Sequence, residues 1–282
     1  MDFRTPVALP SPSFHISPME RMLFVGSCFA DNIGRRFQEE RFRAVVNPYG
    51  VMYNPASILH TVRQYTDSLP QVAVLTLGTN HVYRLRATGE IVDNCQKRPQ
   101  SLFTEEELSV SECADCLSGA VDLLLQRNHK VHVVLTVSPI RYAKYGFHGS
   151  QLSKATLLLA ADEVVRRFPG VADYFPAYEI VNDELRDYRF YAPDMLHPSA
   201  QAVEYIYERF AATYFSKETH EFIAAWRPVK EAVAHRPLHP ESDAYRRFVA
   251  DTREKARQLL HRYPTLDLSD VLLDGQRLVQ EG

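Results

Sequence analysis

Three short apolar runs constrain the fold of this 282-residue chain more than any other feature of its sequence. They cover residues 22–25, 72–77 and 131–137, and each is followed by small polar residues. Runs of this length without polar alternation are typical of parallel strands that are buried on both faces of a sheet. The sequence therefore predicts three central strands that end in turns able to carry function.

Segments with helical spacing separate these runs, and shorter elements lie among them. We expect helices over residues 28–40, 152–168 and 199–215, a hairpin over 82–92, a fourth strand within 174–181, and a helix from Thr104, where Thr-x-x-Glu matches a capping box. Strands that alternate with helices predict a three-layer α/β/α fold with a mainly parallel sheet. Ligands of such sheets bind beyond the carboxyl ends of the strands.

No internal repeat is found, and the simplest division of the chain has two parts. Residues 1–220 are expected to form the α/β core, and residues 221–282 a C-terminal helical extension packed on or beside it. The extension includes a charged helix over 242–261 whose alternating signs suit a solvated face.

Composition and charge exclude several classes of function. Lys plus Arg number 32 against 35 Asp plus Glu, and no basic run would hold nucleic acid or a membrane surface. No apolar stretch approaches the roughly 18 residues of a membrane span, and the N-terminus lacks a signal-peptide pattern, so a cytoplasmic location is expected. Apart from one CxxC, at Cys113 and Cys116, the four cysteines lack metal-ligand spacing, and they are expected to be reduced thiols. No nucleotide-binding glycine motif occurs, and no cofactor or metal is predicted.

The turn after the first apolar run holds a candidate nucleophile. Gly26 allows a sharp turn, and the hydroxyl of Ser27 would stand at the N-terminus of the following helix, whose free N–H groups attract negative charge. A serine in this position is also a common helix N-cap, and both interpretations stay open on this evidence.

A serine nucleophile needs a base and a group that holds the base. Asp194 and His197 are three residues apart, between the last expected strand and the last helix of the core. This position returns the pair to the carboxyl ends of the strands. The alternative is a capping aspartate beside a surface histidine.

Acyl transfer also needs hydrogen-bond donors for the developing oxyanion. Gly50 offers an N–H group with no Cβ beside it, and Asn80 offers a side-chain amide after the second run. A turn glycine and a strand-end asparagine are the plain structural alternatives.

Several motifs together resemble one family. The segment Gly-Ser-Cys-Phe-Ala at 26–30 is joined in order by NPYGVMYNP at 47–55, LTLGT at 75–79, SPIR at 138–141 and DMLHP at 194–198. Over about residues 20–215 the chain is similar to the GSCFA family, a branch related to the SGNH, or GDSL-like, hydrolases. The resemblance implies an SGNH-type, flavodoxin-like sheet with an inserted hairpin.

The resemblance also implies roles for individual residues. Ser27 would be the nucleophile, His197 the base and Asp194 its partner, with the N–H groups of Ser27 and Gly50 and the amide of Asn80 forming the oxyanion hole. SGNH enzymes usually follow this asparagine with aspartate, whereas His81 follows it here. His81 and His148 are candidate substrate contacts, with a structural role as the alternative. Cys28 is a rival nucleophile, since a thiol at a helix N-terminus is activated, but adjacent side chains diverge and the sequence favours Ser27.

The predicted function is therefore a serine esterase that cleaves an ester or acyl group of a small molecule or glycan through an acyl-enzyme on Ser27. O-acetylated carbohydrate is suggested by the SGNH resemblance alone. An acyltransferase with the same triad, and a non-catalytic binding protein that retains the fold, are the alternatives. The sequence does not specify acyl length or oligomeric state.

Overall fold

A computed structural model describes residues 4–93, 95 and 98–272 of the chain and contains a five-stranded sheet in the order β2-β1-β3-β7-β8. Every neighbouring pair of strands is parallel. The strands are β1 (Arg21–Gly26), β2 (Arg43–Val46), β3 (Val72–Leu77), β7 (His132–Val137) and β8 (Ala172–Tyr174). Counted along the chain, this order is 2-1-3-4-5, the flavodoxin-like arrangement. The predicted α/β fold class is confirmed, and the three apolar runs form the three central strands.

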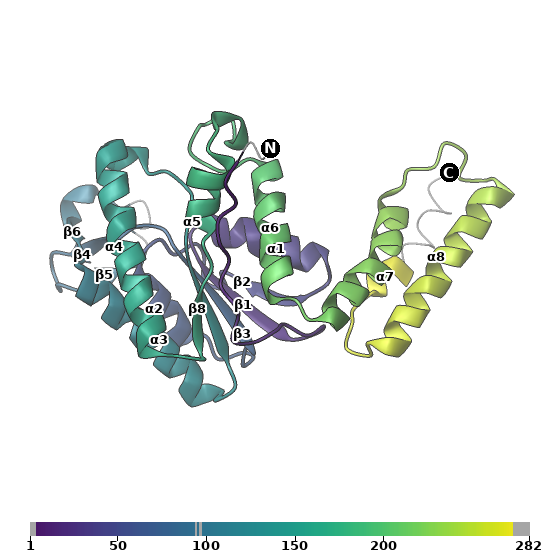
Figure 1. Cartoon of the computed structure of the whole chain (residues 1–282), viewed down its shortest axis with the longest axis horizontal. Coiled ribbons are helices and arrows are strands. Elements are labelled where there is room, and N and C mark those ends of the chain that lie inside the picture. Colours follow the sequence, from purple (N-terminus) through teal and green to yellow (C-terminus); the bar gives the residue numbers. More distant parts are fainter. Residues whose placement is uncertain (1–3, 94, 96–97, 273–282) are drawn as a thin grey trace.

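Helices cover both faces of this sheet (Figure 1). One face carries α2 (Pro55–Gln64), α3 (Val110–Arg127) and α4 (Gly146–Arg167), and the other carries α1 (Cys28–Glu39) and α6 (Ala200–Tyr214). Successive residues of a strand point to opposite faces. Leu23 and Val25 accordingly pack with the first group of helices, and Met22 and Phe24 with the second.

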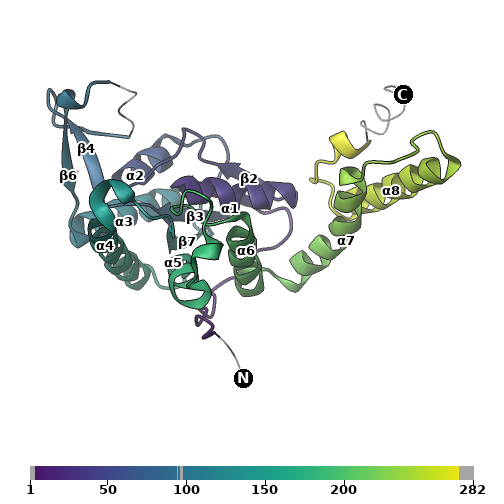
Figure 2. The same cartoon turned by 90° about the horizontal axis from the view of Figure 1, so that it is seen from above.

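A small antiparallel sheet is inserted after β3, as the predicted hairpin anticipated, and Figure 2 shows it at one end of the molecule. Its strands are β4 (His81–Leu85), β5 (Ile91–Val92) and β6 (Phe103–Glu107). The prediction that a helix starts at Thr104 is wrong, because this residue pairs with Arg84 across the sheet. Ser109, five residues later, forms the capping box instead, and α3 starts at Val110.

The fourth strand predicted within 174–181 is also wrong for most of its length. β8 ends at Tyr174, and Phe175 donates the last hydrogen bond to β7, at the carbonyl of Leu135 (2.8 Å). Pro176 has no N–H group to continue the ladder, so the chain turns into helix. The short helical segments are η1 (Gln100–Leu102), η2 (Ala143–Tyr145), α5 (Ala177–Glu179), the π-helix η3 (Ile180–Leu185) and η4 (Tyr188–Phe190).

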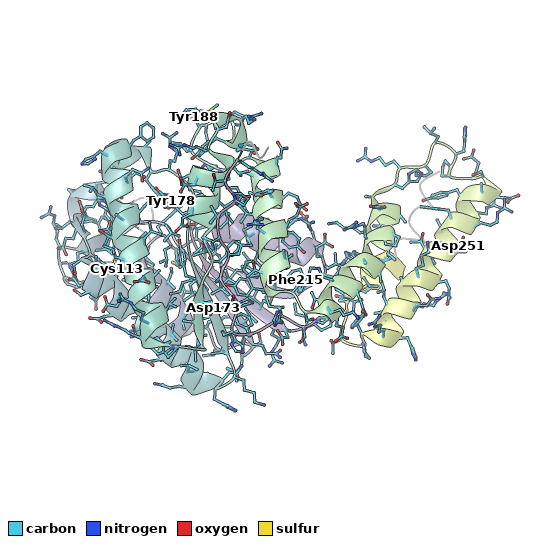
Figure 3. All side chains as sticks on the ribbon, viewed as in Figure 1. Cys113, Asp173, Tyr178, Tyr188, Phe215 and Asp251 are labelled. Carbon is cyan, nitrogen blue, oxygen red and sulfur yellow. The ribbon has the colours of Figure 1, made fainter. Side chains whose placement is uncertain are left out.

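The C-terminal part consists of α7 (Lys217–Ala234) and α8 (Asp243–Arg262), which lie beside the core in Figures 1 and 2. Phe215, labelled in Figure 3, lies at the junction of α6 and α7. The indole of buried Trp226 donates to the carbonyl of Glu39 at the end of α1 (3.3 Å), so this tryptophan joins the two parts. None of the described helices has the length and apolar character that a membrane crossing requires.

Candidate active site

The turn between β1 and α1 is built around Gly26, which ends the strand. Its φ is +146°, and a Cβ at this position would lie 2.1 Å from the carbonyl oxygen of Thr76 on β3. Only glycine allows both the conformation and the close approach. The chain therefore passes from strand to helix within one residue, Ser27.

The hydroxyl of Ser27 lies inside the protein. Ser27 is 0% exposed, its Oγ accepts from the N–H group of Phe29 (3.3 Å), and Oγ lies 3.3 Å from Oγ1 of Thr76. Its own N–H group donates to the carbonyl oxygen (3.2 Å) and Oγ1 (3.1 Å) of Thr76. The N-cap interpretation of Ser27 is thus confirmed, and a substrate carbon reaches Oγ only after neighbouring side chains move.

Cys28, the next residue, is more open. It is half-buried as the first residue of α1, and its Sγ lies 3.8 Å from the hydroxyl of Tyr53. Burial, reinforced by the nearby thiol, raises the pKa of Tyr53 to about 12, so the tyrosine stays a neutral hydrogen-bond partner at ordinary pH.

Asp194 and His197 form a hydrogen-bonded pair on the loop before α6. Nδ1 of His197 lies 2.6 Å from Oδ2 of Asp194, and Oδ1 of Asp194 accepts from the N–H groups of Leu196 (2.9 Å) and His197 (3.0 Å). These backbone donors and the ring lower the pKa of Asp194 to about 2. A carboxylate at Nδ1 leaves Nε2 free to take up a proton, as in a general base.

Contacts at the carboxyl end of the sheet bring this loop toward the β1–α1 turn. The N–H group of Arg141, after β7, donates to the carbonyl of Leu196 (3.0 Å). A Cβ at Gly78 would lie 2.5 Å from the hydroxyl of Tyr142 and 3.3 Å from Cβ of Ser27. The hydroxyl of Tyr142 and the side chain of Ser27 therefore lie against the same glycine. No hydrogen bond joins the Ser27 hydroxyl to the His197 ring in the described part of the chain.

The three predicted oxyanion donors already donate within the protein. The N–H group of Ser27 bonds Thr76, that of Gly50 donates to the carbonyl of Asn47 (2.9 Å), and Nδ2 of Asn80 donates to the carbonyl of Leu108 (2.8 Å). Gly50 has a φ of +95° and open space at its Cβ position. The amide of Asn80 has a second proton, which this bond leaves free.

The two histidines predicted as substrate contacts differ in environment. His81 is buried on β4, where its ring stacks on Tyr145 at 3.6 Å, and burial lowers its pKa. His148 is exposed in the first turn of α4. Both roles remain predictions.

Sequence reasoning missed Lys154, which lies fully buried on α4. Its Nζ donates to the carbonyl of Gly78 (2.6 Å) and lies 5.0 Å from the ring centroid of Tyr142. Burial lowers its pKa to about 7. A lysine three residues before Leu157, on the apolar stripe of its helix, was the available signal.

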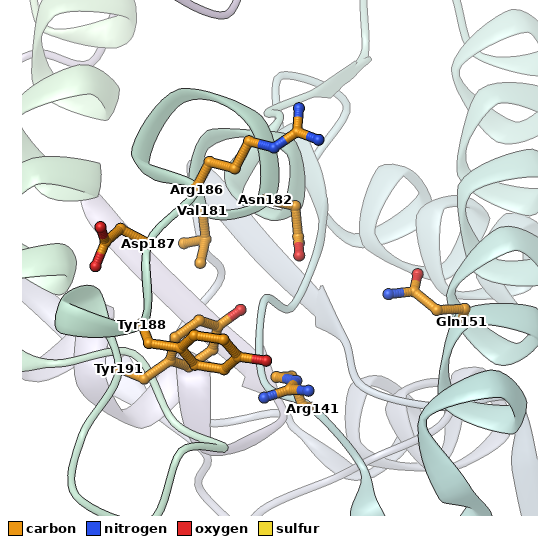
Figure 4. Close-up of a pocket in the computed structure, with 8 residues that line it drawn as sticks. All are labelled: Arg141, Gln151, Val181, Asn182, Arg186, Asp187, Tyr188 and Tyr191. Atoms are coloured by element: carbon orange, nitrogen blue, oxygen red, sulfur yellow. The ribbon is translucent and has the colours of Figure 1, made fainter. Parts of the chain in front are cut away.

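Arg141 was also missed, although it lies only four residues after the end of β7. It lines a pocket of about 210 Å³ together with residues of α4 and of the segment 181–191 (Figure 4). The signals in the sequence were its place in the SPIR motif at 138–141 and its position after a strand end, where ligands of parallel sheets bind.

Comparisons with known proteins give a family and some distant structural likenesses. The sequence profile of the GSCFA family matches residues 21–71 and 63–210, and that of the C-terminal domain of GSCFA domain proteins matches residues 226–281. No curated protein matches the sequence.

Three carbohydrate esterases illustrate the solved structures that the chain is similar to. An acetylxylan esterase from Geobacillus stearothermophilus is 13% identical, with 72% of this chain and 98% of that chain covered and a TM-score of 0.47. A family two carbohydrate esterase from Clostridium thermocellum is 12% identical, with coverages of 70% and 64% and a TM-score of 0.43. A family 3 carbohydrate esterase from Talaromyces cellulolyticus is 9% identical, with coverages of 72% and 98% and a TM-score of 0.41. Likenesses at this level carry no functional argument.

Proposed function

The chain belongs to the GSCFA family, and from this premise we propose that it is an ester hydrolase that works through a covalent acyl-enzyme. The observation that carries the proposal is the Asp194–His197 pair at the carboxyl edge of a parallel sheet. Such a pair provides an oriented base, and the β1–α1 turn, at the same edge of the sheet, provides the nucleophile.

In the mechanism that the sequence predicts, the nucleophile is Ser27. Its hydroxyl proton passes to Nε2 of His197 while Oγ bonds to the substrate carbonyl carbon. The C–O bond to the alcohol then breaks, and the leaving oxygen takes the proton from Nε2. Water next gives a proton to Nε2 while its oxygen bonds to the acyl carbon. The bond between the acyl carbon and Oγ then breaks, Oγ takes the proton back from Nε2, and the acid is released. Asp194 keeps its charge and holds the ring.

The negative charge on the carbonyl oxygen needs donors during both steps. We assign this role to the N–H groups of Ser27 and Gly50 and to the second amide proton of Asn80. The first two now donate to Thr76 and Asn47, so substrate binding must redirect or share these bonds.

A thiol nucleophile at Cys28 is the second candidate, and one observation favours it. The side chain of Cys28 is partly open, whereas Ser27 is 0% exposed. The steps are the same, with a thioester on Sγ in place of the ester on Oγ. Ser27 then keeps its structural role as the N-cap of α1.

Trapping the acyl-enzyme tests both forms of the proposal. Turnover of 4-nitrophenyl acetate is quenched with acid, and the acetyl group is located by peptide mass mapping in wild type and in Ser27→Asn, Cys28→Ala and His197→Ala. Asparagine lacks the hydroxyl but still caps a helix, which protects folding. Ser138→Ala, at another fully buried serine, is the matched control.

Acetyl on residue 27 that Ser27→Asn abolishes supports the serine mechanism, and acetyl on Cys28 that Cys28→Ala abolishes supports the thiol mechanism. Either adduct should be lost in His197→Ala and kept in Ser138→Ala. A folded wild type that neither forms an adduct nor hydrolyses any short acyl ester contradicts the proposal and favours a binding protein. Adding an acceptor alcohol to the reaction separates hydrolysis from acyl transfer by the product formed.

A further inference from the structure

The pocket at Arg141 is fixed to the loop that carries the Asp194–His197 pair. Arg141 bonds this loop twice, through its N–H group to the carbonyl of Leu196 and through Nη1 to the carbonyl of Met195, both at 3.0 Å. Leu196 and Met195 lie between the aspartate and the histidine. A group bound by Arg141 is therefore held by a residue that contacts the loop of the proposed base.

The guanidinium of Arg141 is framed by aromatic rings and lacks an acidic partner within the described residues. Its carbon lies 4.0 Å from the ring centroid of Phe147, 5.6 Å from that of Tyr188 and 5.5 Å from that of Tyr191. Because Nη1 is held by Met195, the edge formed by Nε and Nη2 keeps its donors. Such an edge suits a carboxylate or phosphate oxygen pair.

The other charged residues of the pocket leave it positive. Arg186 also lines it, and Nη1 of Arg186 lies 3.9 Å from Oδ1 of Asp183, outside hydrogen-bond distance. Asp187 lines it too, but its oxygens accept from the N–H group (2.8 Å) and Nη2 (3.2 Å) of Arg189. The pocket is thus lined by two cations, Arg141 and Arg186, and by one carboxylate, which already accepts hydrogen bonds from Arg189.

Two amide side chains supply further polar groups. Oε1 of Gln151 accepts from the Tyr178 hydroxyl, so its amide N–H groups remain available, and Figure 4 shows its nitrogen turned toward the pocket. Nδ2 of Asn182 donates to the carbonyl of Tyr178 (2.8 Å), which leaves Oδ1 to accept from a ligand hydroxyl.

We propose that this pocket binds an anionic group, a carboxylate or a phosphate, carried by the ester substrate, with the Nε–Nη2 edge of Arg141 as its main contact. The inference rests on the proposed function, because it names the substrate class of that same site. The charge belongs either to the alcohol part or to the acyl part of the ester, since both extend from the bond that is cleaved.

Two matched pairs of esters test the proposal and locate the charge. 4-Acetoxybenzoate against its methyl ester places the carboxylate on the alcohol part, and mono-4-nitrophenyl glutarate against its methyl ester places it on the acyl part. We measure kcat/KM for each pair in wild type, Arg141→Gln and Arg166→Gln. Arg166 lies on α4, exposed and outside the pocket, and is the matched control.

We expect wild type to prefer the charged member of one pair by about 10- to 100-fold, as a charge-assisted hydrogen bond provides. Arg141→Gln should bring this ratio close to one, and Arg166→Gln should leave it unchanged. The ratio corrects for any loosening of the His197 loop, which would affect both esters alike. Equal kcat/KM for charged and neutral esters in wild type, or a preference that survives in Arg141→Gln, overturns the proposal.

Direct binding separates this proposal from the proposed function. If no ester is hydrolysed, 4-hydroxybenzoate, glutarate and phenyl phosphate are titrated against wild type and Arg141→Gln by calorimetry. Binding of an anion to wild type that is lost in the variant supports the pocket without any catalysis. Absence of binding to wild type, or equal binding to both proteins, overturns it.

Discussion

The carboxylate of Asp194 orients the ring of His197, the proposed base. The N–H groups of His197 and Leu196 and the His197 ring lower the pKa of Asp194 to about 2, so it stays ionised at any pH above about 4. We expect Asp194→Asn to lower kcat/KM by roughly 10³- to 10⁴-fold, because an amide favours the wrong tautomer of the ring. Rates measured from pH 4 to pH 9 should show no titration of Asp194 in wild type.

An ionisation that Asp194→Asn removes from the acid side of that profile would contradict this assignment. Asparagine can still accept from both N–H groups through its oxygen, so the melting temperature of the variant should stay close to that of wild type. A lower kcat/KM with an unchanged melting temperature would show that the base is impaired, and a lower melting temperature would show that the loop is loosened.

A second residue, Lys154, makes stability depend on pH in a direction that can be worked out. Burial lowers its pKa to about 7 in the folded protein, against 10.5 as the ordinary value. Between these values the unfolded chain binds more protons, so the free energy of unfolding rises with pH. This gain in the free energy of unfolding is absent below pH 7 and complete above pH 10.5.

We expect the difference in unfolding free energy between wild type and Lys154→Met to grow in favour of wild type by roughly 1 kcal/mol per pH unit from pH 7 to pH 10. Urea titrations at several pH values measure it. Taking the difference removes the titration of cysteines and tyrosines, which both proteins share. A difference that stays flat over this range would show that the lysine is charged in the fold or reached by water.

At the scale of elements, local patterns predicted the three central strands of the main sheet but not the edge strand β2, and the segment expected to hold β8 overlaps that strand only at its first residue. The apolar runs of β1, β3 and β7 were evident because every residue of these strands except Arg21 and His132 is buried. Two Ser/Thr-x-x-Glu patterns, from Thr104 and from Ser109, offer the same capping signal. Only the pairing of β6 with β4, a contact distant in sequence, decides that the second one begins the helix.

In the candidate site, too, features that depend on one local motif were predictable and features that depend on distant contacts were not. The Asp194–His197 pair was predictable because both partners lie in one short motif. The burial of Ser27 and the relative openness of Cys28 were not, because they depend on Thr76 and Tyr53 from other elements. Arg141 and Lys154 were missed because their environments are assembled from several helices and loops.

The junction of β3 and β4 gives a prediction at this scale. Nδ2 of Asn80 donates to Leu108, and this bond ties the inserted sheet to the end of β3. Asn80→Ala should lower the unfolding free energy by about 1–2 kcal/mol, because the Leu108 carbonyl loses its partner. If the second amide proton serves the oxyanion, kcat should also fall by about 10²- to 10³-fold.

Asn128→Ala is the matched control, since Nδ2 of Asn128 also bonds a backbone carbonyl, that of Pro70 (2.8 Å), at the opposite end of the sheet. The control should lose stability alone. A similar result for Asn80→Ala, with unchanged kcat, would leave Asn80 as a tether and remove it from the oxyanion hole.

At the scale of the whole molecule, the two ends of α1 have different neighbours: the proposed nucleophile lies at one end, and the C-terminal helices pack at the other. The N-terminus of α1 carries Ser27 and Cys28, and its far end, about 18 Å away for 12 residues, receives the C-terminal helices. There the indole of Trp226 bonds Glu39, and Nζ of Lys230 lies 2.8 Å from the carboxylate of Glu40. The extension therefore touches the end of α1 that is remote from the proposed nucleophile.

This arrangement predicts that damage to the extension changes stability and leaves the chemistry intact. Trp226 is 2% exposed and packs with Phe222 and Leu259, so Trp226→Ala should lower the unfolding free energy by about 3–5 kcal/mol. At a temperature where the variant is folded, kcat/KM should stay within about twofold of wild type. Val233→Ala, at an exposed position of the same helix, should change stability by less than about 0.5 kcal/mol. A tenfold loss of kcat/KM in folded Trp226→Ala would instead mean that α1 transmits the docking of these helices to its N-terminal residues.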